Sequence, residues 1–337
     1  MTAPRFGFFF WPWSPEYTVR MVDLAERDQW DLVGIADTPG NAMDPWVALT
    51  LAATRTTRVA LAACVTNLVT RHPAITAGAA GSLELVAPGR VILGVGTGHS
   101  GVVNLGAGAS DPSRFRRGLA FTRALLAGES ATLDGVTTRL PGLSRRVPVY
   151  AAASGPAALR TTGAVADGAF VNYGLQAEHV AQARAAIAAG AAHGRRPVAD
   201  VDTWWIACLD VSERRDEAFD ELGNILGFVA AYVVGADPGA RGVPVALQPA
   251  IGELRKAYST RRAEMDAGLV HRLGLFDYLR ARLAVAGTPE DCVEQVRSAV
   301  AAGARQLMFT VSLAADPVRT VELFGTRVLP RVRAAVD

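Results

Sequence analysis

Short apolar runs alternate with helix-like segments along the chain, and this alternation limits the possible folds more than any other feature. Several runs are apolar at every position, as in Val91-Ile92-Leu93-Gly94-Val95. A strand that is apolar on both faces suits a parallel sheet covered on both sides better than an antiparallel sheet with one face in water. We expect eight such strands, over residues 6–11, 32–36, 59–65, 90–95, 147–152, 168–172, 203–209 and 306–311.

Eight strand–helix units predict an α/β protein of the (β/α)8 type, a TIM barrel, with an open doubly wound sheet as the main competitor. The length fits one such barrel, so we expect a single domain over residues 1–337. Two stretches exceed the simple repeat. Residues 131–140 predict a small hairpin around Asp134-Gly135. Residues 235–287 form an insertion between strands seven and eight, long enough to cover the barrel mouth.

Proline marks the expected helix starts. Five residue pairs combine an N-cap side chain with proline at the first helical position, where its missing N–H costs nothing. Most of them lie between a strand and the helix that follows, so they locate the βα loops that build the active face of a barrel. The pairs are Ser14-Pro15, Asp44-Pro45, Asp111-Pro112, Thr288-Pro289 and Asp316-Pro317.

Charge and cysteine content argue against several classes of protein. The formal net charge is only +2, which offers no electrostatic footprint for nucleic acid or an anionic membrane. No stretch supplies about 20 apolar residues for a membrane span, and the apolar run over residues 8–11 has no basic leader before it. The three widely spaced cysteines suggest neither a disulfide framework nor a zinc site. We therefore expect a cytoplasmic protein that binds neither nucleic acid nor membrane.

Residues 96–101 match the pattern GxGxxG directly after the fourth expected strand. In a dinucleotide-binding fold the pattern follows the first strand and opens a helix, and an acidic residue lies about 20 residues further on. Here we expect residues 102–108 to be a glycine-rich loop without a helix start. We favour a flexible βα loop, whose small residues let a flat ligand approach the backbone, over a Rossmann dehydrogenase.

Other polar residues also fall in the expected βα loops. Asp37 ends the second strand and could hold a ligand hydroxyl or act as a base, although a turn-forming Asp is the alternative. Ser154-Gly155-Pro156 opens a helix whose free N–H groups suit a phosphate, and an ordinary helix cap fits equally well. His72 and His99 could exchange protons, or be merely solvated. No His, Asp or Glu residues have metal-ligand spacing, so we expect no metal site.

The chain resembles the luciferase-like flavin-dependent oxidoreductases, most closely the branch that uses the deazaflavin coenzyme F420. The resemblance covers most of the chain and is strongest over residues 6–126 and 147–172. The motifs that carry it are Cys64-Val65-Thr66-Asn67, Thr70-Arg71-His72-Pro73, Gly89-Arg90-Val91-Ile92-Leu93-Gly94-Val95-Gly96, and Ala153-Ser154-Gly155-Pro156 with Val165-Ala166-Asp167-Gly168 behind it.

The resemblance implies a flat flavin or deazaflavin ring across the barrel mouth, with a non-proline cis peptide bond at Cys64–Val65 behind it and the cofactor phosphate at Ser154 and Gly155. Relatives often carry Asp or Glu where this chain has His99, so the role of that carboxylate does not carry over. The cofactor-binding residues that we expect are Asp37, Cys64, Val65, Thr66, Asn67, Thr97, Gly98, His99, Ser100, Ala153, Ser154, Gly155 and Pro156.

We expect an enzyme that transfers a hydride between F420 and a small organic substrate, with Asp37 and His99 as the acid–base residues. Trp11, Trp13 and Trp46 are candidates for the wall of the substrate site. One alternative is a monooxygenase that receives reduced FMN from a separate flavin reductase. Another is a flavin-binding protein without turnover, against which the polar residues of the mouth argue. The resemblance also implies a homodimer.

Overall fold

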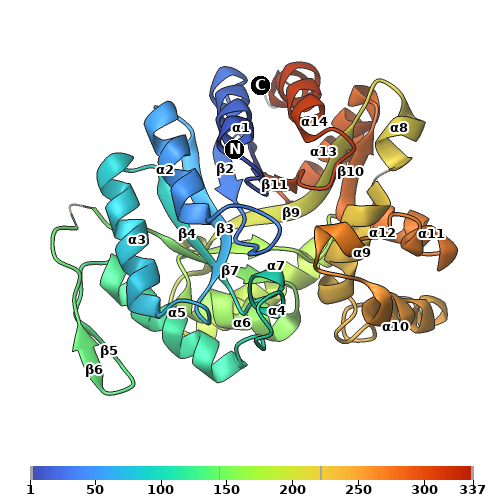
Figure 1. Ribbon diagram of the computed structural model, residues 1–337. Coiled ribbons are helices and arrows are strands. Elements are labelled where there is room, and N and C mark those ends of the chain that lie inside the picture. Colours follow the sequence, from blue (N-terminus) through green and yellow to red (C-terminus); the bar gives the residue numbers. More distant parts are fainter. Residues whose placement is uncertain (1–2, 144, 221, 335–337) are drawn as a thin grey trace.

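Eight parallel strands close into a barrel in the computed structural model, which describes residues 3–143, 145–220 and 222–334 (Figure 1). The ring closes because β9 pairs with both β8 and β11. The predicted (β/α)8 fold is therefore confirmed, and each expected strand lies within two residues of an observed one. The barrel strands are β1 (Arg5–Phe10), β2 (Leu32–Ile35), β3 (Ala60–Asn67), β4 (Val91–Gly96), β7 (Val149–Ala153), β8 (Gly168–Val171), β9 (Asp202–Val211) and β11 (Gln306–Thr310).

Helices surround the barrel, as Figure 1 shows. All five predicted Pro-marked starts begin a helix, and in each the N-cap side chain accepts a hydrogen bond from a backbone N–H of the first turn. His72 caps α3 in the same way, through Nδ1 and the N–H of Ala74. The helices outside the insertion are α1 (Pro15–Arg27), α2 (Pro45–Arg55), α3 (Pro73–Val86), α4 (Ser100–Val103), α5 (Pro112–Leu126), α6 (Pro156–Val165), α7 (Ala177–His193), α8 (Arg215–Asp220), α9 (Leu222–Val233), α13 (Pro289–Ala301), α14 (Pro317–Leu323) and α15 (Leu329–Arg333), with short helical turns at Val198–Asp200 and Phe324–Val328.

Side chains fill the inside of the barrel. Phe170, Trp204 and Met308 are buried there in one cluster. Glycine makes room for the Phe170 ring, because a Cβ at Gly94 would lie 2.8 Å from it. Because side chains fill the interior, a ligand cannot enter the barrel itself and must bind beyond the strand ends.

The predicted hairpin is present as β5 (Ala131–Leu133) and β6 (Val136–Thr138). Its two turn residues, Asp134 and Gly135, both have positive φ, at 48° and 83°. Two such residues form the tight turn that matches the twist of paired strands. The hairpin projects away from the barrel (Figure 1), so it takes no part in the mouth.

The predicted insertion over residues 235–287 is largely helical and packs on α9 to form a separate apolar cluster. One part of the prediction is wrong. The last four residues form the strand β10 (Ala284–Gly287), which pairs with the end of β9 at Cys208–Val211 and thus belongs to the sheet. The other elements are a turn at Val245–Leu247, α10 (Gln248–Ala257), a turn at Arg262–Glu264, α11 (Leu269–Arg272) and α12 (Phe276–Leu283). Within the described residues, no helix is long and apolar enough to cross a membrane.

Candidate active site

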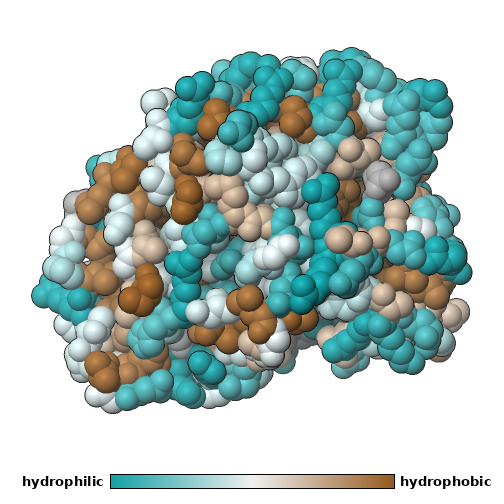
Figure 2. Space-filling model, viewed as in Figure 1, coloured by the Kyte–Doolittle hydropathy of each residue, from teal (hydrophilic) through white to brown (hydrophobic). Residues whose placement is uncertain are grey.

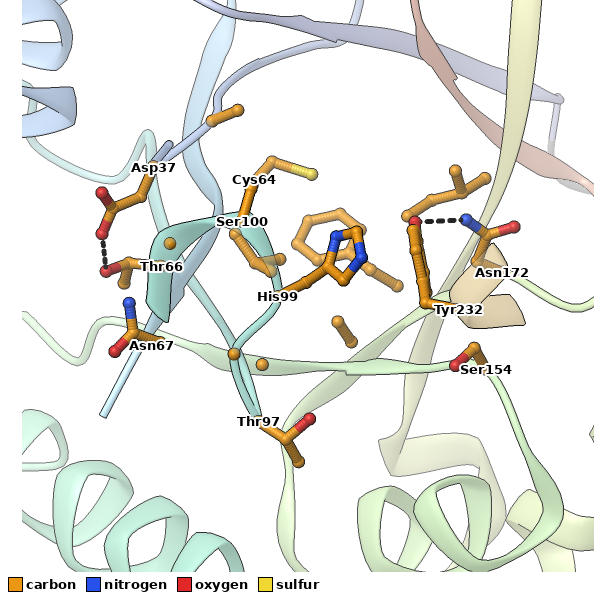
Figure 3. Close-up of a pocket in the computed structure, with 18 of the residues that line it drawn as sticks. Asp37, Cys64, Thr66, Asn67, Thr97, His99, Ser100, Ser154, Asn172 and Tyr232 are labelled. Carbon is orange, nitrogen blue, oxygen red and sulfur yellow. Dashed lines mark hydrogen bonds between the residues drawn. The ribbon is translucent and has the colours of Figure 1, made fainter. Parts of the chain in front are cut away.

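A cavity of about 370 Å³ lies at the carboxyl ends of the strands (Figure 3). Every predicted cofactor residue lines it except Gly155 and Pro156, which stand just beyond its edge. The strand ends of a parallel barrel meet on one face, which is why residues from distant parts of the sequence converge here. The residues that line the cavity are Phe9, Trp11, Ala36, Asp37, Cys64, Val65, Thr66, Asn67, Gly96, Thr97, Gly98, His99, Ser100, Gly101, Ala152, Ala153, Ser154, Ala158, Phe170, Asn172, Ile206, Phe228, Tyr232 and Arg241.

The end of β3 forms the back wall of the cavity. The peptide bond between Cys64 and Val65 is cis, as predicted, and the register of β3 against β4 shifts between Ala63 and Thr66. The Cys64 side chain is buried, and burial raises the pKa of its thiol. Cys64 is therefore a neutral part of the wall rather than a thiolate nucleophile.

Asp37 follows β2 and contacts the neighbouring strand end. Its Oδ2 accepts a hydrogen bond of 2.7 Å from the Oγ1 of Thr66, and the pair lies on the left of Figure 3. Burial raises the pKa of the Asp37 carboxyl, while the bond from Thr66 and the charge of Arg71 oppose that rise. The carboxyl is thus closer to exchanging a proton near neutral pH than an ordinary Asp.

Asn67 uses only one end of its amide within the protein. Its Oδ1 accepts from the backbone N–H groups of Val69 and Thr70, both at 2.9 Å, and from the Thr70 hydroxyl at 3.1 Å. Its Nδ2 is buried, and no described residue accepts from it. A Cβ at Gly101 would lie 3.1 Å from that nitrogen, so glycine lets the neighbouring loop pass close by. Asn67 therefore offers a fixed, unused donor to the cavity.

The loop after β4 borders the other side. Gly98 has a φ of +106°, a conformation that favours glycine, and a Cβ there would lie 2.2 Å from the Val102 side chain. The expectation of a helix-free loop is wrong for one turn, because α4 begins at Ser100 and ends at Val103. One helical turn after the fourth strand of a closed barrel is not a dinucleotide-binding unit, so the Rossmann interpretation is excluded.

His99 lies between the two ends of the cavity, among aromatic rings (Figure 3). Its Nε2 is 2.9 Å from the hydroxyl of Tyr258, and its ring contacts Phe228 and Tyr232. Burial lowers the pKa of the imidazole to about 4. His99 is therefore neutral at pH 7, a state in which an imidazole offers a hydrogen bond or a basic nitrogen rather than a positive charge.

The start of α6 forms the opposite end of the cavity. Gly155 is the N-cap of α6 and provides no side-chain cap, and Pro156 occupies the first turn. A Cβ at Gly155 would lie 2.5 Å from the guanidinium of Arg241, so this cation lies directly against the helix start. Ser154 faces the same end (Figure 3). A helix N-terminus and a guanidinium together favour an anion.

Asn172, which follows β8, leaves a second amide atom unused. Its Nδ2 donates to the hydroxyl of Tyr232 at 3.0 Å, and no described residue pairs with its buried Oδ1. Sequence reasoning missed Asn172, although a polar residue at the end of an expected strand could have drawn attention to it. It also missed Tyr232 and Arg241, which come from α9 and the insertion and carry no recognisable motif.

The three tryptophans proposed for the substrate wall separate in the structure. Trp11 lines the cavity. Trp13 stacks on Tyr17 and lies under Arg262, and Trp46 packs against the core, so neither lines it. Within the described residues, no group of three or more His, Cys, Asp or Glu side chains could hold a metal ion.

Comparison with known proteins gives a consistent result. Residues 11–306 match the family described as luciferase-like monooxygenase. The chain is 28% identical to a 5,10-methylenetetrahydromethanopterin reductase of Methanolobus tindarius, over 96% of this chain and 99% of the relative. It is 32% identical to an F420-dependent glucose-6-phosphate dehydrogenase of Beutenbergia cavernae, over 94% of this chain and 92% of the relative.

Solved structures share the fold. The coenzyme F420-dependent tetrahydromethanopterin reductase of Methanopyrus kandleri matches with a TM-score of 0.78 at 22% identity, over 98% of this chain and 100% of its own. An F420-dependent secondary alcohol dehydrogenase, solved with an F420–acetone adduct, matches with a TM-score of 0.75 at 18% identity, over the same shares of the two chains. At these identities the likeness supports the barrel alone.

Proposed function

Because the chain belongs to the luciferase-like monooxygenase family, we propose that it is an F420-dependent oxidoreductase that transfers a hydride between the deazaflavin and a small organic substrate. The names of its relatives support the cofactor, since both the reductases and the dehydrogenases include F420-dependent enzymes. The enzyme class follows from the family, described as luciferase-like monooxygenase, together with relatives named as reductases and dehydrogenases.

One observation carries the proposal: two residues that line opposite ends of the cavity each carry a buried hydrogen-bonding atom without a partner among the described residues. Asn67 offers a donor, and Asn172 offers an acceptor, both buried and without a partner among the described residues. A flavin or deazaflavin ring carries carbonyl acceptors and an N–H donor that match them. Buried polar atoms in folded proteins nearly always have hydrogen-bond partners. The lack of partners for these two atoms therefore fits a site in which a bound ligand supplies them.

The α6 end fits the cofactor phosphate. Ser154, Gly155 and the first turn of α6 offer a hydroxyl and backbone N–H groups, and Arg241 adds a positive charge. Burial lowers the pKa of the Arg241 guanidinium without discharging it at neutral pH. We infer that these residues hold the phosphate, while Cys64 and Val65 lie behind the ring.

When bound, the deazaflavin supplies the carbon that gives or accepts the hydride. Oxidation of an alcohol also releases a hydroxyl proton, and reduction of a carbonyl requires one. Asp37, with its raised pKa, and His99, neutral with a pKa of about 4, are the groups at the cavity that can take or return this proton. Trp11 and Phe228 line the cavity with apolar surface, which helps a bound ring to displace water from the site.

Titration with both cofactors tests the proposal. We expect oxidised F420 to lose fluorescence on binding with a dissociation constant in the micromolar range or below, and FMN to bind at least about 100-fold more weakly, a difference of roughly 2.7 kcal/mol. Tight FMN binding without F420 binding would instead support a monooxygenase that depends on a flavin reductase. Binding of neither would contradict the proposed cofactor site.

We also propose that the protein is a cytoplasmic homodimer. The three cysteines are free and buried, which fits a reducing compartment. Val47 on α2 and Ile75 on α3 are more than half exposed, and Figure 2 shows apolar side chains over these helices on the left of the molecule. A second copy could cover them. Sedimentation equilibrium at micromolar concentration should give twice the monomer mass, and a monomer would contradict the dimer.

A further inference from the structure

The imidazole of His99 is enclosed by three aromatic rings that come from one later part of the chain. Phe228 and Tyr232 belong to α9, and their ring centroids lie 4.9 and 4.5 Å from that of His99. Tyr258 follows α10, and its ring is parallel to the imidazole within 4°, at 5.8 Å. The β4 loop therefore presents the histidine, but the insertion and the helix before it decide which way the ring faces.

One polar contact holds the imidazole in this enclosure. The hydroxyl of Tyr258 is 2.9 Å from Nε2 of His99, and no described residue forms a hydrogen bond with Nδ1. A neutral imidazole has one donor nitrogen and one acceptor nitrogen. The phenol hydroxyl of Tyr258 has no other partner among the described residues and is a better donor than acceptor, so it donates to Nε2 and leaves the proton of the imidazole on Nδ1. With Nε2 committed to Tyr258, Nδ1 is the nitrogen left for a ligand in the cavity.

Residues 258–262, the segment that begins with Tyr258, form hydrogen bonds with both loops that carry the proposed acid–base residues Asp37 and His99. Thr260 donates from its hydroxyl to Oδ1 of Asn104 at 2.7 Å, just beyond α4. Asn41, in the loop after Asp37, donates to the carbonyl of Thr260 at 2.8 Å and accepts from the N–H of Arg262 at 2.9 Å. These bonds therefore fix the position of Tyr258 relative to the loops that carry Asp37 and His99.

We propose that Tyr258 is a positioning residue for the hydride-transfer site: its hydroxyl fixes the ring orientation and the tautomer of His99, so that Nδ1 faces the ligand. The inference rests on the proposed function, because that function identifies the cavity as a hydride-transfer site. The orientation and tautomer of His99, however, are properties of the protein without cofactor. Tyr258 lies outside every motif that links the chain to its family.

Nuclear magnetic resonance of 15N-labelled histidine side chains tests the alignment directly in the cofactor-free protein, with His99→Gln to assign the signals. We expect the two His99 nitrogens of the wild type to show the well-separated shifts of a single neutral tautomer at pH 7.5. Tyr258→Phe keeps the ring and removes the hydroxyl, and its shifts should move toward the average of two tautomers. Ser259→Ala removes a neighbouring hydroxyl that bonds Glu264 rather than His99, and should match the wild type.

Addition of F420 provides the second arm. In the wild type we expect the Nδ1 signal to shift more than the Nε2 signal, whereas in Tyr258→Phe both should respond. Unchanged tautomer shifts in Tyr258→Phe would overturn the proposal, and so would a larger Nε2 response in the wild type. If Tyr258→Phe fails to fold, a mixture of tautomers in the wild type overturns it equally. Failure of F420 to bind at all would contradict the proposed function, while the cofactor-free spectra would still decide the role of Tyr258.

Discussion

Asn67 divides its amide group between the protein and the cavity. Three donors of the turn at Val69 and Thr70 converge on Oδ1, which fixes the orientation of the amide and leaves Nδ2 as a buried donor without a described partner. An unpaired buried donor costs about 1–3 kcal/mol, a cost that a bound acceptor removes. Oδ1 of Asn67 therefore contributes to the stability of the protein, whereas Nδ2 is free to contribute to its affinity for a ligand.

Asn67→Asp keeps the oxygen that the turn needs and replaces the unused donor with a second acceptor. We expect the melting temperature to stay within a few degrees of the wild type, while the dissociation constant for F420 rises at least about 10-fold, or roughly 1.4 kcal/mol. Asn67→Ala removes both functions, so it should lower the melting temperature as well. Wild-type F420 affinity in Asn67→Asp would show that Nδ2 does not meet the cofactor.

Two histidines, the buried His179 and the partly buried His99, make the stability of the protein depend on pH. Burial lowers the pKa values of His99 and His179 to about 4, below the value near 6.5 in an unfolded chain. The unfolded state therefore binds more protons, and stability present above pH 6.5 is lost as the pH falls toward 4. Each imidazole should cost up to about 2 kcal/mol between pH 7 and 5.

Urea unfolding at pH 7 and pH 5 measures this loss. The double variant His99→Gln, His179→Gln should lose much less stability than the wild type over the same interval. Carboxylates with lowered pKa values, such as Glu26 and Asp291 at about 2, lose their contribution only at lower pH. An equal loss in both proteins would mean that the two imidazoles are not neutral and buried as the structure indicates.

At the scale of elements, the start of α6 and the segment of Arg241 form one anion site from two distant parts of the chain. Gly155 has extended backbone torsion angles that any residue can adopt, so alanine there would cause no backbone strain. Its Cβ would instead meet the Arg241 guanidinium at 2.5 Å, and this flexible side-chain end can move aside. We expect Gly155→Ala to fold normally and to weaken F420 binding about 10-fold or more, as measured by fluorescence titration.

Gly252→Ala is a matched control for this change. A Cβ at Gly252 meets nothing within 4 Å, so F420 affinity should stay at the wild-type value. Arg241→Gln should weaken F420 binding as Gly155→Ala does, since both remove the cation from the helix start. Full affinity in both Gly155→Ala and Arg241→Gln would remove the phosphate from this end of the cavity.

The elements that local chemistry controls were predictable. Apolar runs located all eight barrel strands, and the proline-marked caps located five of the helix starts, because both depend on residues adjacent in sequence. β10 was missed because the short run Ala284–Gly287 is a strand only through its pairing with Cys208–Val211. α4 was missed because a single turn of four residues has no periodicity to detect.

At the scale of the whole molecule, barrel closure brings Asp37, Asn67, His99 and Ser154 to one mouth. That half of the site could be predicted, since carboxyl-terminal strand ends of a barrel meet on one face. The half from Tyr232, Arg241 and Tyr258 could not. How the insertion folds over the mouth depends on packing against α9 rather than on any local pattern.

A crystal structure of the protein with F420 bound is the decisive measurement for the proposed cofactor site. We expect the deazaflavin ring against Cys64 and Val65, hydrogen-bonded to Nδ2 of Asn67 or Oδ1 of Asn172, with the phosphate at Gly155 and Arg241. Electron density for F420 outside this cavity, or a ring that leaves both amides unpaired, would show that the proposed site is wrong.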